Sequence, residues 1–244
     1  MDSLRVAAFQ RQPIFDDVTK IVQRLSEDLT WCDDQGVQLA VFPECYLQGY
    51  AVDRPTIARR ALTLNDAQFA AILLTLAPFR TAFVLGIVEQ RGTAFYNTAA
   101  IVQGGILLGA YAKCHPDEPG FDAGNEFPVF STAGWQFGVN ICNDANFADP
   151  ALRISRQGAR LLCYPLNNML PPATAEKWRN KSVANLQDRA IETGCWVVSS
   201  DVVGTHNELV SYGCTCIVAP DGRVVRRAAE GSEGSIVSDL AYEQ

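Results

Sequence analysis

Short apolar runs alternate with amphipathic segments at the start of this chain, and that alternation limits the fold more than any other feature. Residues 4–10 are predicted to form a buried strand, and residues 18–29 place apolar side chains at helical spacing. Gly36 ends that helix, and residues 37–42 follow as a strand that is apolar on both faces. A strand, a helix and a second strand this close together predict a layered α/β fold.

The remainder of the chain continues the pattern. Further helices are predicted at residues 64–78, 148–156 and 175–194, and further strands at 82–88, 96–102, 106–111, 127–130, 137–142, 160–164, 195–200, 214–219 and 224–225. The tail, residues 230–244, is polar and rich in glycine and serine, and we expect it to pack loosely or against a partner chain. With no internal repeat and no linker, residues 1–244 are expected to form a single domain.

Composition excludes several classes of function. A net charge of -7 argues against nucleic-acid binding. No apolar stretch approaches the roughly 18 residues of a membrane span, and the N-terminus lacks the features of a signal peptide, so a cytoplasmic protein without membrane contact is expected. The eight cysteines are then expected to be free thiols. They include no Cys-x-x-Cys, and the two histidines do not bracket them at zinc-finger spacing, so neither a metal site nor a cofactor is predicted.

Three reactive side chains each follow or end a predicted apolar strand: Glu44, Lys113 and Cys142. Taken singly, Glu44 is most simply a surface residue and Cys142 a small buried hydrophobe. Together they supply a base, a cation and a nucleophile. A thiol with a pKa near 8.5 is mostly protonated at neutral pH, and a glutamate in a dry environment can have a pKa raised enough to accept its proton. Lys113 and the backbone N–H of Asn143 would stabilise the oxyanion that follows, at roughly 3 kcal/mol per donor.

The three motifs around these residues resemble those of the nitrilase superfamily, the carbon-nitrogen hydrolases. They are Val41-Phe42-Pro43-Glu44, Tyr111-Ala112-Lys113-Cys114-His115, and Gly138-Val139-Asn140-Ile141-Cys142-Asn143-Asp144 with Phe147 after it. The resemblance implies a four-layer α-β-β-α sandwich and a Glu44, Lys113 and Cys142 triad. It also implies a thioester or thioimidate on Cys142 and assembly into a homodimer or larger homo-oligomer.

The resemblance further implies a second glutamate that positions substrate. Glu118 is the best match, with Asp117 and Glu126 as alternatives. Asn143 stands where the family more often has an aromatic residue, and Asp201 stands where an asparagine is usual, which puts a structural hydrogen bond in doubt. The residues expected by position to line the substrate pocket are Asn143, Asn146, Asn167 and Asn168.

Neighbouring polar residues are expected to support the site. Asp144 is predicted to hold the turn after Cys142 through backbone N–H groups. His115 is predicted to pack or hydrogen-bond behind the site, and His206 to lie in a loop. Arg189 and Glu192 are expected to pair with each other or to brace the site from behind.

The expected function is hydrolysis of small linear amides or N-carbamoyl compounds. No arginine follows Cys142, which disfavours a carboxylate-bearing substrate, whereas Asp117, Glu118 and Asp122 would suit one that carries an amine. Nitrile hydrolysis is an alternative, disfavoured by Asn143. A catalytically silent protein that serves as a binding or assembly module is another, disfavoured because Glu44, Lys113 and Cys142 are all present.

Overall fold

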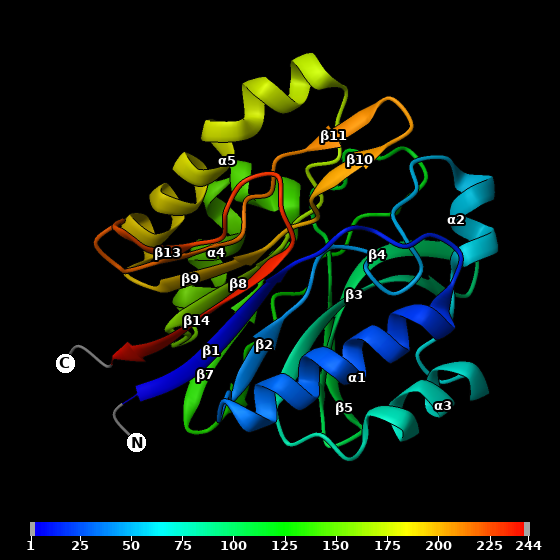
Figure 1. The fold of residues 1–244 in the computed structure, drawn as a ribbon, viewed down its shortest axis with the longest axis horizontal. Coiled ribbons are helices and arrows are strands. Elements are labelled where there is room, and N and C mark those ends of the chain that lie inside the picture. Colours follow the sequence, from blue (N-terminus) through cyan, green and yellow to red (C-terminus); the bar gives the residue numbers. More distant parts are fainter. Residues whose placement is uncertain (1–2, 242–244) are drawn as a thin grey trace.

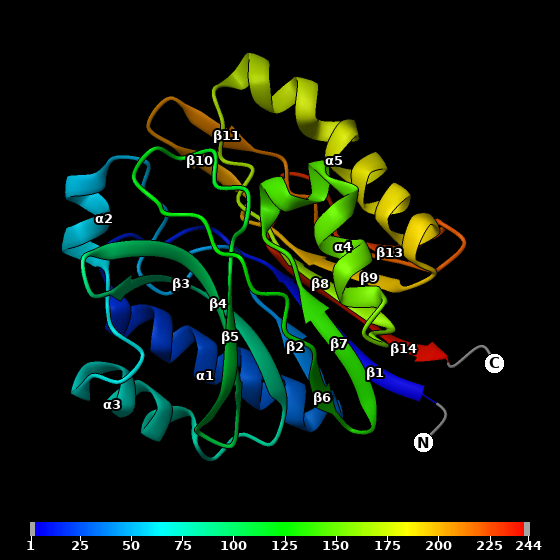
Figure 2. The same cartoon turned by 180° about the vertical axis from the view of Figure 1, so that it is seen from behind.

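The computed structural model describes residues 3–241, in which two β-sheets face each other and helices cover both outer faces (Figures 1 and 2). In spatial order, the first sheet contains β14 (Gly234–Ala241), β1 (Ser3–Gln10), β2 (Leu39–Val41), β3 (Ala82–Arg91), β4 (Ala94–Gln103) and β5 (Ile106–Ala112). The second contains β13 (Val224–Arg227), β12 (Cys216–Val218), β9 (Trp196–Ser200), β8 (Leu161–Pro165), β7 (Trp135–Val139) and β6 (Phe130–Thr132). The predicted four-layer α-β-β-α sandwich is confirmed.

Helices complete the outer layers. Helices α1 (Val18–Asp34) and α3 (Ala67–Leu76) cover the first sheet, and α4 (Ala148–Ser155) and α5 (Pro172–Thr193) cover the second (Figures 1 and 2). The remaining elements are helix α2 (Arg54–Arg60), the 3-10 helix η1 (Cys142–Asn146) and a hairpin of β10 (Gly204–His206) and β11 (Leu209–Ser211). Among the described residues, no helix has both the length and the apolar character needed to cross a membrane.

Most of the described core lies in three apolar layers, because the strands are buried on both faces; a smaller fourth cluster packs around Ile57 of α2. Along β1, Val6 and Ala8 pack against the second sheet, while Ala7 and Phe9 pack with α1. A third layer lies between the second sheet and α4 and α5. Side chains alternate along a strand, so one strand serves two layers.

Aspartate caps explain where two helices begin. The predicted helix 64–78 begins later, at Ala67, because the Asp66 carboxylate accepts the N–H of Phe69 at 2.7 Å. Helix α2 is not among the predicted elements, because the segment before residue 64 contains proline, which is typical of loops. In the structure, Asp53 accepts the N–H of Thr56 at 2.9 Å, and Pro55 occupies the first turn, where its missing N–H costs nothing.

The prediction of a loosely packed tail was wrong. Strand β14 pairs antiparallel with the whole of β1, from Ser3 opposite Ala241 to Gln10 opposite Gly234. Leu240 is fully buried between the sheets, and Ile236 and Val237 are partly buried against the core. Pairing satisfies the edge of β1, which would otherwise expose a row of backbone groups. Residues 242–244 lie outside the described range.

His206 lies in β10 rather than in the predicted loop. Its ring packs 4.1 Å from the ring of Phe15, between centroids. The β10–β11 hairpin was not predicted because its strands are only three residues long.

Gly86 on β3 tests how tightly the turn that carries Glu44 is packed. A Cβ atom at Gly86 would lie 2.2 Å from the carbonyl oxygen of Pro43 and 2.5 Å from the N–H nitrogen of Cys45. We expect Gly86→Ala to lower the free energy of unfolding by about 1–3 kcal/mol or more, since backbone atoms must move. Chemical denaturation measures this. Gly234→Ala is the matched control, because a Cβ there meets no atom within 4 Å; equal effects of the two variants would contradict the packing argument.

Candidate active site

Glu44 follows β2 and is buried between the two sheets. Its Oε1 accepts hydrogen bonds from Lys113 Nζ at 2.9 Å and from Asn97 Nδ2 at 2.6 Å. Its Oε2 is buried and has no hydrogen-bond partner among residues 3–241. Burial raises the pKa of Glu44 to about 7, with the positive charge of Lys113 opposing this rise and the negative charge of Glu118 adding to it. Glu44 can therefore exchange a proton near neutral pH.

Lys113 follows β5 and its side chain is only 1% exposed. Its Nζ lies 2.9 Å from both Glu44 Oε1 and Glu118 Oε1, and 3.4 Å from Asp117 Oδ1. Burial alone would lower the pKa of Lys113, but the charges of Glu44, Cys142, Glu118 and Asp117 outweigh burial and raise this pKa well above its usual value. The ammonium group therefore stays charged.

The structure separates the three candidates for the second glutamate. Glu118 is buried, and its Oε1 also accepts the hydroxyl of Tyr50 at 2.5 Å. Its Oε2 has no hydrogen-bond partner in the described part of the chain. The Asp117 side chain is 64% exposed at the pocket rim, and Glu126 is exposed. Of the three candidates, Glu118 is the one buried against Lys113.

Cys142 begins η1, three residues after β7 ends. Its backbone is in the left-handed region, with φ of 43°, which is strained for a cysteine. Asp144 holds this turn, as predicted. Its Oδ2 accepts the N–H of Ile141 at 2.9 Å and the Tyr111 hydroxyl at 2.8 Å, and its Oδ1 accepts the N–H of His115 at 2.8 Å. The Cys142 backbone is thereby fixed at the edge of the sheet.

The Cys142 thiol lies within the electrostatic reach of the other two residues. Burial raises the pKa of Cys142 well above its usual value, and the charge of Glu44 adds to the rise. The charge of Lys113 and a hydrogen bond from the backbone N–H of Asn167 act in the opposite direction. The resting thiol is therefore protonated, and it needs a base before it can attack a substrate.

A pocket of about 190 Å³ opens onto Cys142. All four asparagines predicted to line the pocket do so: Asn143, Asn146, Asn167 and Asn168. Among the described residues that line this pocket, Asp117 has the charged side chain. The other lining residues have amide, hydroxyl, thiol or apolar side chains. Asp122, expected nearby, does not line it, because its carboxylate accepts the N–H of Phe95 at 2.9 Å.

Three asparagines, Asn143, Asn146 and Asn185, form a hydrogen-bonded wall of the pocket. Asn185 on α5 donates to Asn146 Oδ1 at 2.5 Å, Asn146 donates to Asn143 Oδ1 at 2.6 Å, and Asn143 donates to the carbonyl of His115 at 2.9 Å. Each amide fixes the orientation of the next. The wall next to Cys142 is therefore polar and preorganised where an aromatic ring would make it apolar.

Asp201 is buried, and its carboxylate is hydrogen-bonded to Asn168. Its carboxylate accepts the N–H of Asn168 at 3.0 Å and the Asn168 side-chain amide at 2.7 Å. Burial raises the pKa of Asp201 to about 6.

On α5, Arg189 pairs with Glu192 at 2.8 Å, as expected, and donates to the Ala145 carbonyl in η1 at 2.8 Å.

Sequence reasoning missed two residues of the site, Asn97 and Tyr50. Asn97 is a buried polar residue inside the apolar strand β4, and such an interruption is a usable signal of a buried hydrogen bond. Tyr50 lies in an irregular segment with no pattern to mark it. Both were missed because their partners, Glu44 and Glu118, are far away in sequence.

Comparison with known proteins gives a consistent result. The family described as carbon-nitrogen hydrolase matches residues 5–244. The chain is 30% identical over 228 residues to a protein named "Hydrolase in pqqF 5'region" from Pseudomonas protegens, covering 90% of this chain and 77% of that one. It is 27% identical over 246 residues to a nitrilase from Pyrococcus abyssi, covering 97% and 89% of the two chains.

The fold also matches a solved structure. An amidase from Nesterenkonia sp. superposes with a TM-score of 0.83 at 23% identity, covering 99% of this chain and 92% of that one. This likeness concerns the fold, whereas the family match extends over nearly the whole sequence. The chain belongs to the carbon-nitrogen hydrolase family, the nitrilase superfamily.

Proposed function

We propose that this hydrolase cleaves the C–N bond of small linear amides or N-carbamoyl compounds with Cys142 as nucleophile, Glu44 as base and Lys113 as oxyanion donor. The observation that carries the proposal is the shared ammonium. One buried Nζ binds one oxygen each of Glu44 and Glu118, while the second oxygen of each carboxylate has no hydrogen-bond partner within residues 3–241. Two buried acceptors are thus free to receive protons or hydrogen bonds.

Acylation requires a proton to move from the thiol to Glu44. The free Oε2 accepts the proton of Cys142 as the sulfur attacks the carbonyl carbon, and Lys113 stabilises the oxyanion together with the backbone N–H of Asn143. The C–N bond then breaks, the amine or ammonia takes the proton from Glu44, and a thioester remains. In this proposal Glu118 Oε2, which has no hydrogen-bond partner within residues 3–241, accepts a hydrogen bond from the substrate amide.

Deacylation repeats these roles with water as the nucleophile. Glu44 takes a proton from a water molecule while the oxygen of that water attacks the thioester carbon, and Lys113 again stabilises the oxyanion. When the C–S bond breaks, the proton returns to the sulfur and the acid leaves. No cofactor is required at any step.

The pocket lining supports uncharged or amine-bearing substrates. Among the described residues that line the pocket, the charged one is Asp117. No described arginine or lysine lines the pocket to bind a substrate carboxylate. An arginine, Arg60, lines an adjoining cavity of about 490 Å³. Its guanidinium already binds both carboxylate oxygens of Asp16 and the carbonyls of Gly49 and Tyr50, and these groups compete with a substrate carboxylate.

Ammonia release from a panel of amides, ureas and nitriles tests the assignment of Cys142. We expect Cys142→Ala to lower kcat/KM by about 10⁴-fold or more, because the nucleophile of a covalent mechanism is removed. Cys214→Ser, at a buried thiol outside the pocket, should retain activity. An inactive wild type on every substrate, with iodoacetamide labelling Cys142 no faster than other thiols, would refute the proposal; turnover of nitriles alone would favour the nitrilase alternative.

The pH dependence of kcat/KM tests Glu44. The base must be ionised, and its pKa of about 7 means that the active fraction is lost as the pH falls through 7. We expect kcat/KM to reach a plateau above pH 7 and to fall about tenfold per pH unit below it. Glu44→Gln should lower the plateau by about 10²–10⁴-fold, whereas Glu126→Gln should leave the profile unchanged. An acid limb centred near pH 4.5 would exclude a raised pKa.

Paired substrates test Asp117. For an N-carbamoyl amine and its uncharged hydroxyl analogue, we expect Asp117→Asn to raise KM for the amine by about two- to fivefold and to leave the analogue unchanged, because an exposed ion pair contributes modestly. Asp149→Asn, an exposed acid on α4 outside the pocket, is the matched control. Equal changes for both substrates would show that Asp117 does not sense the amine.

A further inference from the structure

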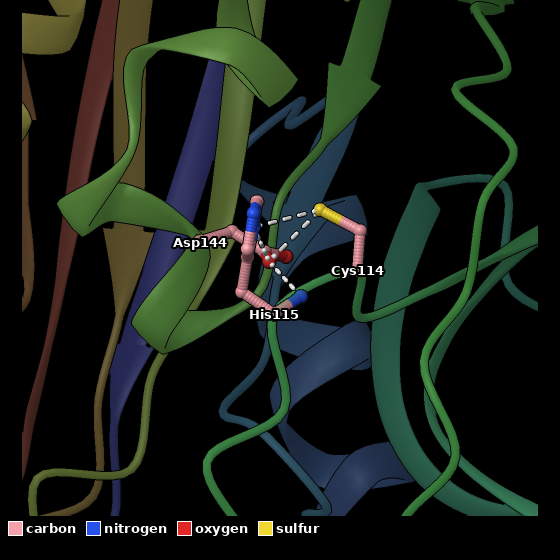
Figure 3. A group of neighbouring side chains, drawn as sticks. All are labelled: Cys114, His115 and Asp144. Atoms are coloured by element: carbon pink, nitrogen blue, oxygen red, sulfur yellow. Dashed lines mark hydrogen bonds and ion pairs between the residues drawn. The ribbon is translucent and has the colours of Figure 1, made fainter.

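Behind the pocket wall, three side chains with metal-binding atoms converge on one point (Figure 3). Cys114 Sγ lies 3.1 Å from His115 Nδ1 and 3.2 Å from Asp144 Oδ1, and His115 Nδ1 lies 3.3 Å from the same Asp144 oxygen. None of these side chains takes part in the reaction proposed above. Asp144 holds the turn after Cys142, but that role does not explain why a thiol and an imidazole also converge on its Oδ1.

The cluster does not form a second hydrolytic triad. In a triad, one ring nitrogen of histidine accepts the nucleophile's proton while the other nitrogen donates to the carboxylate. Here Nδ1 of His115 faces both Cys114 and Asp144. One nitrogen cannot relay a proton between two groups on its own side. The arrangement instead resembles three ligands around a shared centre.

We propose that Cys114 Sγ, His115 Nδ1 and Asp144 Oδ1 bind a divalent cation of zinc type. Thiolate, imidazole and carboxylate are the donors that Zn²⁺ takes in proteins. Zinc bonds of about 2.3 Å to sulfur and about 2.0–2.2 Å to nitrogen and oxygen, at tetrahedral angles, separate sulfur from the other ligands by roughly 3.6 Å and nitrogen from oxygen by roughly 3.4 Å.

The observed triangle is close to this geometry. The nitrogen–oxygen distance of 3.3 Å already fits. The sulfur is at 3.1 and 3.2 Å from the other two atoms, so it must move outward by about 0.4 Å to reach tetrahedral spacing. Cys114 is partly exposed and belongs to none of the core clusters of the described chain, so this movement does not have to displace the core.

The carboxylate ligand is held in place before any cation arrives. Asp144 is fully buried, and its Oδ2 is fixed by the N–H of Ile141 and the hydroxyl of Tyr111. Hydrogen bonds of this kind orient zinc ligands and strengthen binding. A cation would also balance charge, since thiolate and carboxylate together offset its two positive charges.

A cation can reach the site from solvent. The His115 side chain is 35% exposed, and its ring stacks on Phe147 with centroids 4.0 Å apart, which fixes the direction of Nδ1. Three protein ligands leave a fourth position for water. The site is therefore accessible to a cation, and its imidazole ligand is already held in position.

No metal site was predicted, because the cysteines form no Cys-x-x-Cys and the two histidines do not bracket them at zinc-finger spacing. The fold supplies the third ligand: Asp144 follows Cys114 by 30 positions and is brought beside it by η1. Cys114 directly follows Lys113, and Asp144 lies two residues after Cys142. A bound cation would thus cross-link the strand end that carries the lysine to the turn that carries the nucleophile.

The test uses the full chain in a Cys142→Ala background, which removes the reactive thiol as a competing ligand. Co²⁺ is titrated spectroscopically as a probe for Zn²⁺, and Zn²⁺ binding is measured by calorimetry. We expect about one cation per chain, a thiolate-to-Co²⁺ charge-transfer band that Zn²⁺ abolishes, and a melting temperature that rises with Zn²⁺ concentration.

Two further substitutions in that background locate the site. Adding Cys114→Ser should abolish the charge-transfer band and weaken Zn²⁺ binding by at least about 100-fold, while adding Cys214→Ser should change neither. Unchanged melting without metal shows that both variants fold. Binding that survives Cys114→Ser, a Co²⁺ spectrum without sulfur ligation, or no binding at all would overturn the proposal and leave the cluster as a hydrogen-bonded brace.

Discussion

The site depends on one lysine ammonium buried between two carboxylates. Lys113 contacts Glu44 and Glu118 at 2.9 Å each, and all three side chains are almost fully buried. Charges taken out of water are tolerated only when they are paired. Two carboxylates against one ammonium leave a negative charge in excess, which adds to burial in raising the pKa of Glu44 to about 7. The same contacts that make the cluster stable thus prepare it for proton transfer.

This cluster forms because the two sheets are held in register at the end where the functional strands stop. The backbone N–H of Glu44, in the loop after β2, donates to the carbonyl of Leu166 just beyond β8 at 3.2 Å. The Tyr111 hydroxyl on β5 binds Asp144 in η1. These bonds run from one sheet to the other. The sandwich therefore fixes the positions of Glu44, Lys113 and Cys142, the residues proposed as base, oxyanion donor and nucleophile.

The pocket wall and the proposed cation site share the same backbone. A chain of amides runs from Asn185 on α5 through Asn146 and Asn143 to the carbonyl of His115, and the imidazole of that histidine faces Cys114 and Asp144. Substrate selection on one side and cation binding on the other would both act on η1. Asn143, which donates to the carbonyl of His115, is the link between them.

Local patterns were sufficient for the elements that are most regular. Apolar runs identified most of the strands, helical spacing identified α1 and α5, and the ends of three runs identified Glu44, Lys113 and Cys142. They failed for β14, because Gly234–Ala241 is polar enough to resemble a loop and becomes a strand only through pairing with β1. They also failed for α2, because proline is typical of loops as well as of the first turn of a helix, where Pro55 lies.

The sequence by itself determined the layered α/β fold and the residue types that can carry the chemistry, because periodicity and strand ends are local properties. Only the tertiary structure decided which groups meet. Lys113 has Glu118, and not the exposed Asp117, as its buried partner. Asn97 donates a hydrogen bond to Glu44, and Tyr50 donates one to Glu118. Asp144 lies beside Cys114 and His115. These contacts join residues distant in sequence, and burial and pKa depend on such contacts, which no local pattern contains.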